Sequence, residues 1–319
     1  MIYKRIERIG VEVSVVGLGG HEYLANGRSR GFNENSALAV RPGYTFDGFG
    51  QEKRKRVLAA AFEHGINFFD VTIDSEKEAL GRNLKEIPPP YEIYVQTRPE
   101  GMVYSYDPFN AKMAQYDLLK AEVQRGLRLL QRDRLDFLNL GFLQSALDHD
   151  PEYLAKIAYN IGMLKKEGLI RFACADTFSG EHTYLEEIQT GCFDALFINL
   201  NFADHCALQK VLPLAAERGL GVFAREAFMK GALFRMGDEV GVTDRSALAR
   251  LALRWNLSNE QVTAVVVGAD TPDQLANNLG ALESPALSDE EQETLERVKT
   301  SPTYKAYERQ KREQFGYPV

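Results

Sequence analysis

The stretch of sequence that decides the fold is residues 66–81, which read INFFDVTIDSEKEALG. A short apolar run ends on Asp70, a few small polar residues follow, and a helix-like pattern starts at Glu76. Removing a carboxylate from water costs several kcal/mol unless it has a partner. In a barrel of alternating strands and helices, catalytic groups occupy the position just after a strand. We therefore take Asp70 as a candidate active-site carboxylate, with a purely structural, helix-capping role as the alternative.

The same alternation of apolar strand and amphipathic helix repeats along the chain. Strands are expected at residues 15–20, 67–70, 91–97, 134–140, 170–175, 194–199, 220–225 and 262–267. Helices are expected at residues 51–64, 76–86, 117–131, 151–167, 181–190, 206–218, 245–257 and 272–281. The strands lack period-two alternation, as in parallel strands that are buried on both faces. Eight strand–helix units are the number that closes a barrel.

The segments outside this repeat complete the predicted architecture. Residues 2–16 alternate around a turn at Gly10, which predicts a hairpin closing one end of the barrel. A charged helix near 288–299 and a tail, residues 301–319, follow the last unit. The prediction is an α/β protein: one domain over residues 1–319, a (β/α)8 TIM barrel with an N-terminal β-hairpin and a C-terminal helical extension.

Composition narrows the class of protein. The 319 residues are 45% hydrophobic and 26% charged, with a net charge of −7, which fits an ordinary globular protein and argues against a nucleic-acid surface. The chain has no apolar run long enough to span a membrane, and its start lacks a signal-like core, so we expect a cytoplasmic protein. Three cysteines share no metal-type spacing, and no histidine pair does. We expect reduced thiols and no metal site.

Several stretches together resemble the aldo-keto reductase family. Residues 70–81 resemble a family motif of the form D-x-x-x-x-Y-G-x-S-E-x-x-L-G, with a shorter loop. Residues 123–140 (VQRGLRLLQRDRLDFLNL) and 168–179 (GLIRFACADTFS) are similar to two further segments of the family, and residues 249–278 to a fourth. The four segments occur in the family's order and span most of the chain. The resemblance implies a TIM barrel and a nicotinamide-dependent reduction of carbonyl groups.

The resemblance also implies that most of the family's catalytic tetrad is missing. The family uses a tyrosine as general acid, tuned by a lysine, a histidine and an aspartate. Matched by motif, the aspartate is Asp70, the lysine position is Arg98 and the histidine position is Gly141, while the tyrosine has no counterpart between Val71 and Ser75. Arginine stays charged and glycine carries no imidazole. The sequence therefore predicts that ordinary carbonyl reductase activity is absent or very weak.

Coenzyme groups implied by the resemblance are altered as well. The positions that would hold the nicotinamide are Asp176, Thr177, Leu200 and Arg225. The candidate coenzyme contacts are the Lys230–Gly231 turn and the eighth-unit residues Thr271, Gln274 and Asn278. Gly268 and Gln274 stand where cations would clamp a 2′-phosphate, and Asp270 and Asp273 are nearby. We therefore expect NAD(H) rather than NADP(H), or no coenzyme at all.

Charged residues follow several of the predicted strands. Arg98, Asp176 and Arg225 would meet Asp70 at one end of the barrel, either as a ring of salt bridges or as a site for an anionic ligand, because arginine recognises carboxylate and phosphate. His21 follows the first strand and is an acid–base candidate, with a packing role as the alternative. Glu226 is expected to be the charge partner of Arg225.

Two loops remain open in interpretation. Residues 24–50 mix arginines with aromatic residues, and residues 99–116 carry Met102 and further aromatic residues on the same face. The two loops form either a lid over a ligand or a protein interface.

Three functions stay open at this point. The first is a nicotinamide-dependent oxidoreductase acting on a small polar or anionic carbonyl or alcohol, with another group replacing the tyrosine. The second is a non-redox lyase, dehydratase or epimerase that uses the charged strand ends. The third is a catalytically silent barrel that binds a ligand. The expected partner is a small molecule, with no nucleic acid or membrane, and the sequence does not indicate an oligomeric state.

Overall fold

The computed structural model describes residues 1–319 except 21–50, 104–106, 178, 285 and 319. Within the described residues, eight parallel strands form a closed barrel in chain order, and β10 pairs with β3 to complete it. The strands are β3 (Val16–Gly19), β4 (Phe68–Asp70), β5 (Tyr94–Thr97), β6 (Leu135–Gly141), β7 (Ile170–Asp176), β8 (Ala195–Asn199), β9 (Gly221–Arg225) and β10 (Ala264–Val267). The prediction of a (β/α)8 barrel is confirmed.

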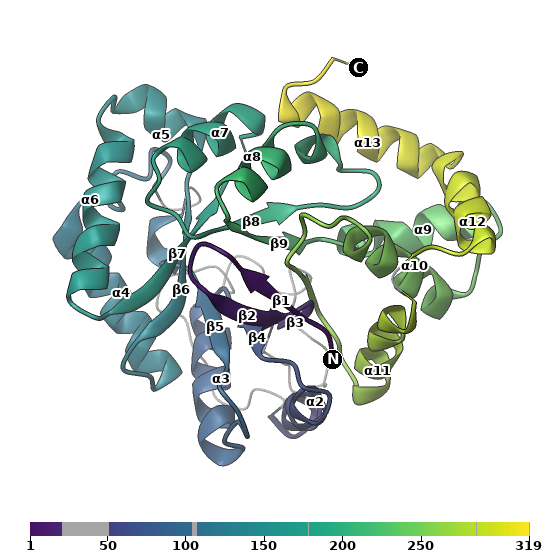
Figure 1. The fold of residues 1–319 in the computed structure, drawn as a ribbon, viewed down its shortest axis with the longest axis horizontal. Helices are drawn as coiled ribbons and strands as arrows, with labels where there is room; N and C mark the ends of the chain where they lie inside the picture. The colour runs from purple at the N-terminus through teal and green to yellow at the C-terminus, as the bar shows by residue number, and fades with distance from the viewer. Residues whose placement is uncertain (21–50, 104–106, 178, 285, 319) are drawn as a thin grey trace.

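Helices surround the barrel and alternate with its strands (Figure 1). They are α2 (Gln51–Glu63), α3 (Asp74–Glu86), α4 (Tyr116–Leu130), α6 (Tyr153–Lys166), α7 (Glu181–Gln189), α8 (Val211–Glu217), α10 (Arg245–Leu257) and α11 (Pro272–Leu279). Additional elements are α5 (Gln144–His149), α9 (Ala232–Glu239), α12 (Asp289–Lys299), α13 (Pro302–Phe315) and the short 3₁₀ turns η1 (Glu100–Met102), η2 (Cys206–Leu208), η3 (Met229–Gly231) and η4 (Gly280–Glu283).

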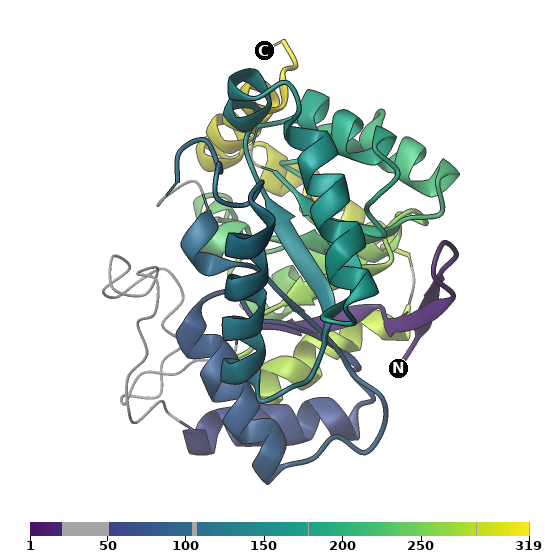
Figure 2. The same ribbon diagram turned by 90° about the vertical axis from the view of Figure 1, so that its left-hand side faces the viewer.

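The N-terminal hairpin closes one end of the barrel, as the sequence predicts. Its strands β1 (Tyr3–Ile6) and β2 (Val11–Ser14) pair antiparallel, and they lie across the barrel end that faces the viewer in Figure 1. In the view turned by 90°, this end of the barrel is on the right, and the hairpin projects from it (Figure 2). Its buried residues Ile6, Val11 and Val13 belong to the same cluster as the residues that fill the barrel. The opposite end is therefore the one available for a ligand.

Aromatic side chains fill the barrel interior. Phe68 of β4, Phe137 of β6 and Phe223 of β9 are fully buried. The ring centroids of Phe68 and Phe223 are 4.3 Å apart, and those of Phe137 and Phe223 are 5.2 Å apart. Burying each such side chain stabilises the fold by roughly 1.5–3 kcal/mol. Gly17 of β3 makes room for this layer, because a Cβ there would lie 2.7 Å from the Phe68 ring.

Residues 66–81, the stretch that decides the fold, contain the residues that cap helix α3 and allow it to pack against α4. Helix α3 starts at Asp74, two residues before the predicted start, because the Glu76 carboxylate accepts hydrogen bonds from the amides of Thr72 (2.7 Å) and Ile73 (3.2 Å). Gly81 allows α3 to pack closely against α4, since a Cβ at this position would lie 2.5 Å from the carbonyl oxygen of Leu129.

Two parts of the described chain differ from the sequence prediction. The tail after residue 300 is not irregular: it forms α13, with Ser301 as its N-cap and the buried Tyr304 hydroxyl donating to the carbonyl of Phe202 (3.2 Å). Helices α5 and α9 were not predicted, since each is short and lies inside a strand–helix connection. In the described part of the chain, no helix is both long and apolar enough to cross a membrane.

Candidate active site

The candidate site lies at the carboxyl ends of the barrel strands. Side chains alternate in direction along a strand, so a residue two positions after an inward-facing one also faces inward. Phe68, Tyr94, Cys174 and Phe223 all belong to the interior cluster. By this spacing, four charged strand-end residues also face the barrel axis: Asp70, Arg98, Asp176 and Arg225.

Asp70 lies deep in the mouth of the barrel, which is the opening at the carboxyl ends of its strands, and keeps partial solvent exposure. Its Oδ1 accepts a hydrogen bond from Gln96 Nε2 at 3.1 Å, in line with the pairing of Asp70 and Gln96 between β4 and β5. Burial raises the pKa of Asp70 to about 7, and the charge of Glu76 adds to this, while Gln96, Arg225 and Arg98 oppose it. A carboxyl group with this pKa can both give and take a proton near neutral pH.

Arg225 and Asp176 form a two-pronged ion pair. The guanidinium donates through Nη1 and Nη2 to the two carboxylate oxygens at 2.9 and 2.7 Å. Its Nε donates to Asn199 Oδ1 at 2.6 Å. The guanidinium also lies over the Phe197 ring, 4.6 Å from the centroid. Because its fork is taken up by these contacts, Arg225 is held rigidly beside the mouth.

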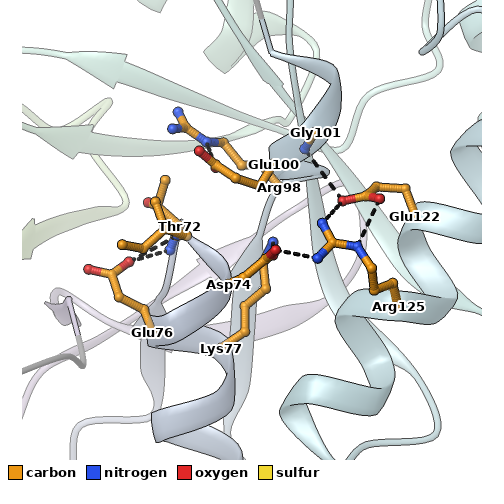
Figure 3. Close-up of polar contacts among 10 residues, drawn as sticks. Thr72, Asp74, Glu76, Lys77, Arg98, Glu100, Gly101, Glu122 and Arg125 are labelled. Carbon is orange, nitrogen blue, oxygen red and sulfur yellow. Dashed lines mark hydrogen bonds and ion pairs between the residues drawn. The ribbon is translucent and has the colours of Figure 1, made fainter. Parts of the chain in front are cut away.

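Arg98 and its neighbours form a second charged group (Figure 3). Arg98 Nε donates to Glu100 Oε2 at 3.0 Å, and burial raises the pKa of Glu100. Below this pair, Lys77 and Asp74 form a fully buried ion pair at 3.1 Å. Arg125 of α4 bonds both Asp74 and Glu122, so the group connects α3 to α4.

Two further sequence predictions about the mouth have different outcomes. His21 lies outside the described residues. Glu226 was expected to be the charge partner of Arg225. Its charge does act on Arg225, but its carboxylate pairs with Lys230 at 3.2 Å, and the ion pair of Arg225 is with Asp176. Glu226 has a left-handed backbone conformation (φ 60°), and Asp176 on the neighbouring inward face occupies the fork of Arg225 instead.

Gly141 lies beside the Asp176 side chain. A Cβ at Gly141 would lie 3.5 Å from Asp176 Oδ2. This is an ordinary contact distance, so a Cβ at this position would fit beside the carboxylate.

A separate pocket forms between α9, α10 and α11. It is lined by Phe228, Phe234, Arg245, Ser246, Ala249, Gly268, Asp270, Asp273, Gln274, Asn277 and Asn278. Thr271 caps α11, as predicted, by accepting from the Gln274 amide at 3.1 Å. Gln274 Oε1 accepts from the Asp270 amide at 2.7 Å. The pocket thus combines aromatic rings with polar side chains, as small-molecule sites commonly do.

The Lys230–Gly231 turn lies beside this pocket in the chain. Both residues have positive φ angles, 53° and 92°, and Gly231 is the N-cap of α9. The first amides of α9 are thus presented at a helix N-terminus, which favours an anion such as a phosphate.

Sequence reasoning missed several residues of these sites. Gln96 could have been found by counting two positions along β5 from Tyr94, an interior residue. Glu100 could not, because it lies in the 3₁₀ turn η1 after the strand. Arg245 could not, because α10 reaches the pocket only in the folded barrel; there its guanidinium lies 5.5 Å from the Phe234 ring centroid and 3.5 Å from Asp238.

The C-terminal helix α13 also contributes to the mouth. It supplies Lys311 and Phe315 to a small cavity next to Asn199.

The residues that the structure describes contain no group of three or more His, Cys, Asp or Glu placed to hold a metal ion. Cys174, Cys192 and Cys206 are free thiols.

Comparisons with known proteins decide the family. The model of the aldo/keto reductase family matches residues 42–245 and 238–300. The chain belongs to the aldo/keto reductase family. Its members are nicotinamide-dependent oxidoreductases, and the family resemblance inferred from the motifs is confirmed.

Individual relatives of this family are distant. L-galactose dehydrogenase from Arabidopsis thaliana is 24% identical over 283 residues, covering 80% of this chain and 86% of that protein. The aldo-keto reductase AKR11C1 from Bacillus halodurans is similar in structure in its holo form (TM-score 0.67) and its apo form (TM-score 0.66). Each form is 20% identical and covers 93% of this chain and 96% of its own. At this identity the structural likeness establishes the fold alone.

Proposed function

We propose that this aldo/keto reductase family member is a nicotinamide-dependent oxidoreductase in which Asp70 replaces the tyrosine as the proton-transfer group. Its substrate is a small polar carbonyl compound or the corresponding alcohol. The observation that carries the proposal is the position and the pKa of about 7 of Asp70. By motif, no residue matches the tyrosine, and the residues at the lysine and histidine positions lack the family's chemistry. Asp70 is a group at the mouth that titrates near neutral pH.

Asp70 performs the proton half of the reaction. In reduction, the carbonyl carbon takes up a hydride with its electron pair, and the carbonyl oxygen takes the proton from the neutral Asp70 carboxyl. In oxidation, the Asp70 carboxylate accepts the hydroxyl proton while the carbon loses the hydride. A bound nicotinamide coenzyme supplies the hydride in reduction and takes it up in oxidation. Gln96 orients the Asp70 carboxyl through its 3.1 Å hydrogen bond.

The pocket between α9, α10 and α11 would hold the adenosine end of the coenzyme. Asn278 is buried there, and Gln274 and Thr271 are tied together at the first turn of α11. The amides at the Lys230–Gly231 turn would meet the pyrophosphate. Asp270 and Asp273 suit the free ribose hydroxyls of NAD(H) and would repel a 2′-phosphate, so we propose NAD(H) as the coenzyme.

One observation favours a second candidate function. The Arg225–Asp176 pair occupies positions that the family resemblance assigns to contacts with the nicotinamide. A non-redox lyase, dehydratase or epimerase acting on an acid would use the same charged mouth, with Asp70 as its acid–base group. A barrel that only binds its ligand is the remaining alternative.

Titration and turnover separate these functions. Calorimetric titration of the purified protein with NADH, NADPH and NAD⁺ tests whether a dinucleotide binds. Turnover with an aldehyde panel, followed by NADH absorbance, then compares the wild type with Asp70→Asn. General acid catalysis contributes about 10²–10⁴-fold, so Asp70→Asn should lower kcat by at least about 10²-fold and leave the affinity for NADH unchanged.

The matched control for this experiment is Asp133→Asn. Asp133 is exposed and lies outside the site, so this variant should keep wild-type turnover. Turnover by Asp70→Asn at the wild-type rate, or absence of binding by all three nucleotides, would reject the proposed function.

A further inference from the structure

The two arginines at the mouth differ in how many of their donors are used. Arg225 places all three of its nitrogen positions on Asp176 and Asn199. Arg98 makes a single hydrogen bond among the described residues, from Nε to Glu100. An arginine has five N–H donors in a planar fork. Among the residues that the structure describes, the Nη groups of Arg98 make no hydrogen bond and so keep the capacity to bind a ligand.

The orientation of Arg98 fits a ligand contact. In Figure 3 its Nε faces Glu100 while both Nη atoms point away from that carboxylate and from the Asp74–Lys77 pair. The side chain is 16% exposed, against 1% for Glu100. Arg98 is thus held through its Nε by a buried carboxylate, and its terminal nitrogens have no hydrogen-bond partner in the described part of the chain.

Charge at the mouth also favours an anion on Arg98. Arg225 and Asp176 neutralise one another in their two-pronged pair. Burial raises the pKa of Glu100, and a guanidinium keeps its proton at all working pH values. Arg98 therefore keeps its positive charge, and its Nη side faces away from Glu100 (Figure 3).

We propose that Arg98 binds a carboxylate of the substrate, which makes the substrate a small hydroxy acid or keto acid. The inference rests on the proposed function and narrows its substrate class. The planar fork of arginine matches the two oxygens of a carboxylate, and the resulting bonds are charge-assisted. Asp70 then serves the carbonyl or hydroxyl oxygen of the same molecule.

The spacing of the two residues suits a short substrate. Asp70 is paired with Gln96 across β4 and β5, and Arg98 lies two residues beyond Gln96. With about 3.3 Å of rise per residue and about 4.8 Å between strands, the Asp70 and Arg98 Cα atoms lie roughly 8 Å apart. Both side chains face the axis, so their polar ends can reach two groups of a molecule a few carbons long.

Matched pairs of compounds test this inference. D-Galacturonate and D-galactose differ by a carboxylate in place of a hydroxymethyl group, and so do pyruvate and hydroxyacetone. Calorimetry or thermal shift measures the binding of each to the wild-type protein, to Arg98→Met and to Arg82→Met. Arg82 is an arginine on the outer side of α3, 42% exposed and paired with Glu78, and it is the matched control.

At least one acid should bind the wild type about tenfold or more tightly than its hydroxymethyl partner, as expected for a hydrogen bond between charged groups. Arg98→Met should abolish this preference, and Arg82→Met should retain it. Equal binding of both acids and their partners, failure of both acids to bind, or a preference that survives in Arg98→Met would overturn the inference. Should Arg98→Met not fold, Arg98→Lys replaces it: losing the fork while keeping the charge should reduce the preference, and an unchanged preference counts against the inference.

NADH oxidation is measured separately, so the two proposals can fail independently. Turnover of galactose or hydroxyacetone without any preference for the acids keeps the oxidoreductase function and rejects the carboxylate site. Binding of the acids through Arg98 with no NADH oxidation keeps the carboxylate site and rejects the oxidoreductase function.

Discussion

At the scale of single residues, Asp70 carries a stability effect that depends on pH. Its pKa rises from an ordinary 3.8 to about 7 in the folded protein. Between these two pH values the folded protein binds the proton more tightly than the unfolded chain does. The free energy of unfolding therefore falls as the pH rises from about 4 to about 7, because an increasingly charged carboxylate must be buried.

Asp70→Asn should remove this pH-dependent fall in the free energy of unfolding. We expect the variant to gain stability relative to the wild type between pH 4 and pH 8, by up to a few kcal/mol at pH 8, since each pKa unit corresponds to about 1.4 kcal/mol. Urea unfolding of both proteins across this pH range measures the difference. A gain in stability together with a loss of turnover is the pattern of a functional rather than a structural carboxylate. A stability difference that does not change with pH would show that Asp70 titrates normally.

At the scale of elements, the contact between α3 and α4 depends on the absence of a side chain at Gly81. A Cβ there would lie 2.5 Å from the Leu129 carbonyl oxygen and 2.7 Å from the Leu130 carbonyl carbon. Backbone atoms cannot move aside as a flexible side chain does. Gly81→Ala should therefore destabilise the protein by about 1–3 kcal/mol despite the better helix propensity of alanine.

Gly162 of α6 provides the matched control. It is also a helical glycine, but a Cβ at this position would meet nothing within 4 Å. Gly162→Ala should stabilise the protein by up to about 1 kcal/mol. Thermal or urea unfolding compares the two variants. The test is whether Gly81→Ala lowers the free energy of unfolding while Gly162→Ala raises it. If Gly81→Ala were as stable as Gly162→Ala, the close approach of the two helices would not hold in solution.

At the scale of the whole molecule, coenzyme preference depends on a pocket that α9, α10 and α11 build together. Asp270 and Asp273 lie in this pocket, and Arg245, its cation, is near Asp238. We expect NADH to bind more tightly than NADPH, because a 2′-phosphate would face the two carboxylates. Asp273→Asn should narrow the difference in Kd between the two nucleotides, as titration calorimetry would measure.

The control for this prediction is Asp117→Asn. Both aspartates are exposed and lie in the first turn of a helix, Asp117 in α4 and Asp273 in α11. Asp117→Asn should leave the ratio of the two Kd values unchanged. Tighter binding of NADPH than NADH by the wild type would contradict the expected preference and would point to Arg245 as the phosphate ligand.

Local pattern was sufficient to predict most of the barrel. Each strand is an apolar run, and each helix has its own periodicity and stop signals. The order of the elements and the hairpin were therefore predictable from the sequence alone. Element ends were less predictable: α3 begins at Asp74 because the Glu76 side chain caps it. Helix α13 was missed because its polar face shows little periodicity and its anchor, Tyr304, packs against the distant Phe202.

The sequence by itself determined the strand–helix repeat, the family and the charged residue types at the strand ends. Only the tertiary structure decided which charges pair. In the sequence, Asp176 and Glu226 are both possible partners of Arg225. The barrel places Asp176 of β7 against Arg225 of β9, with β8 between the two strands, while Glu226 pairs with Lys230. The same closure raises the pKa of Asp70 to about 7 and leaves the Nη groups of Arg98 pointing away from Glu100. Burial and pairing depend on residues far apart in the chain, and a strand-end motif carries no information about them.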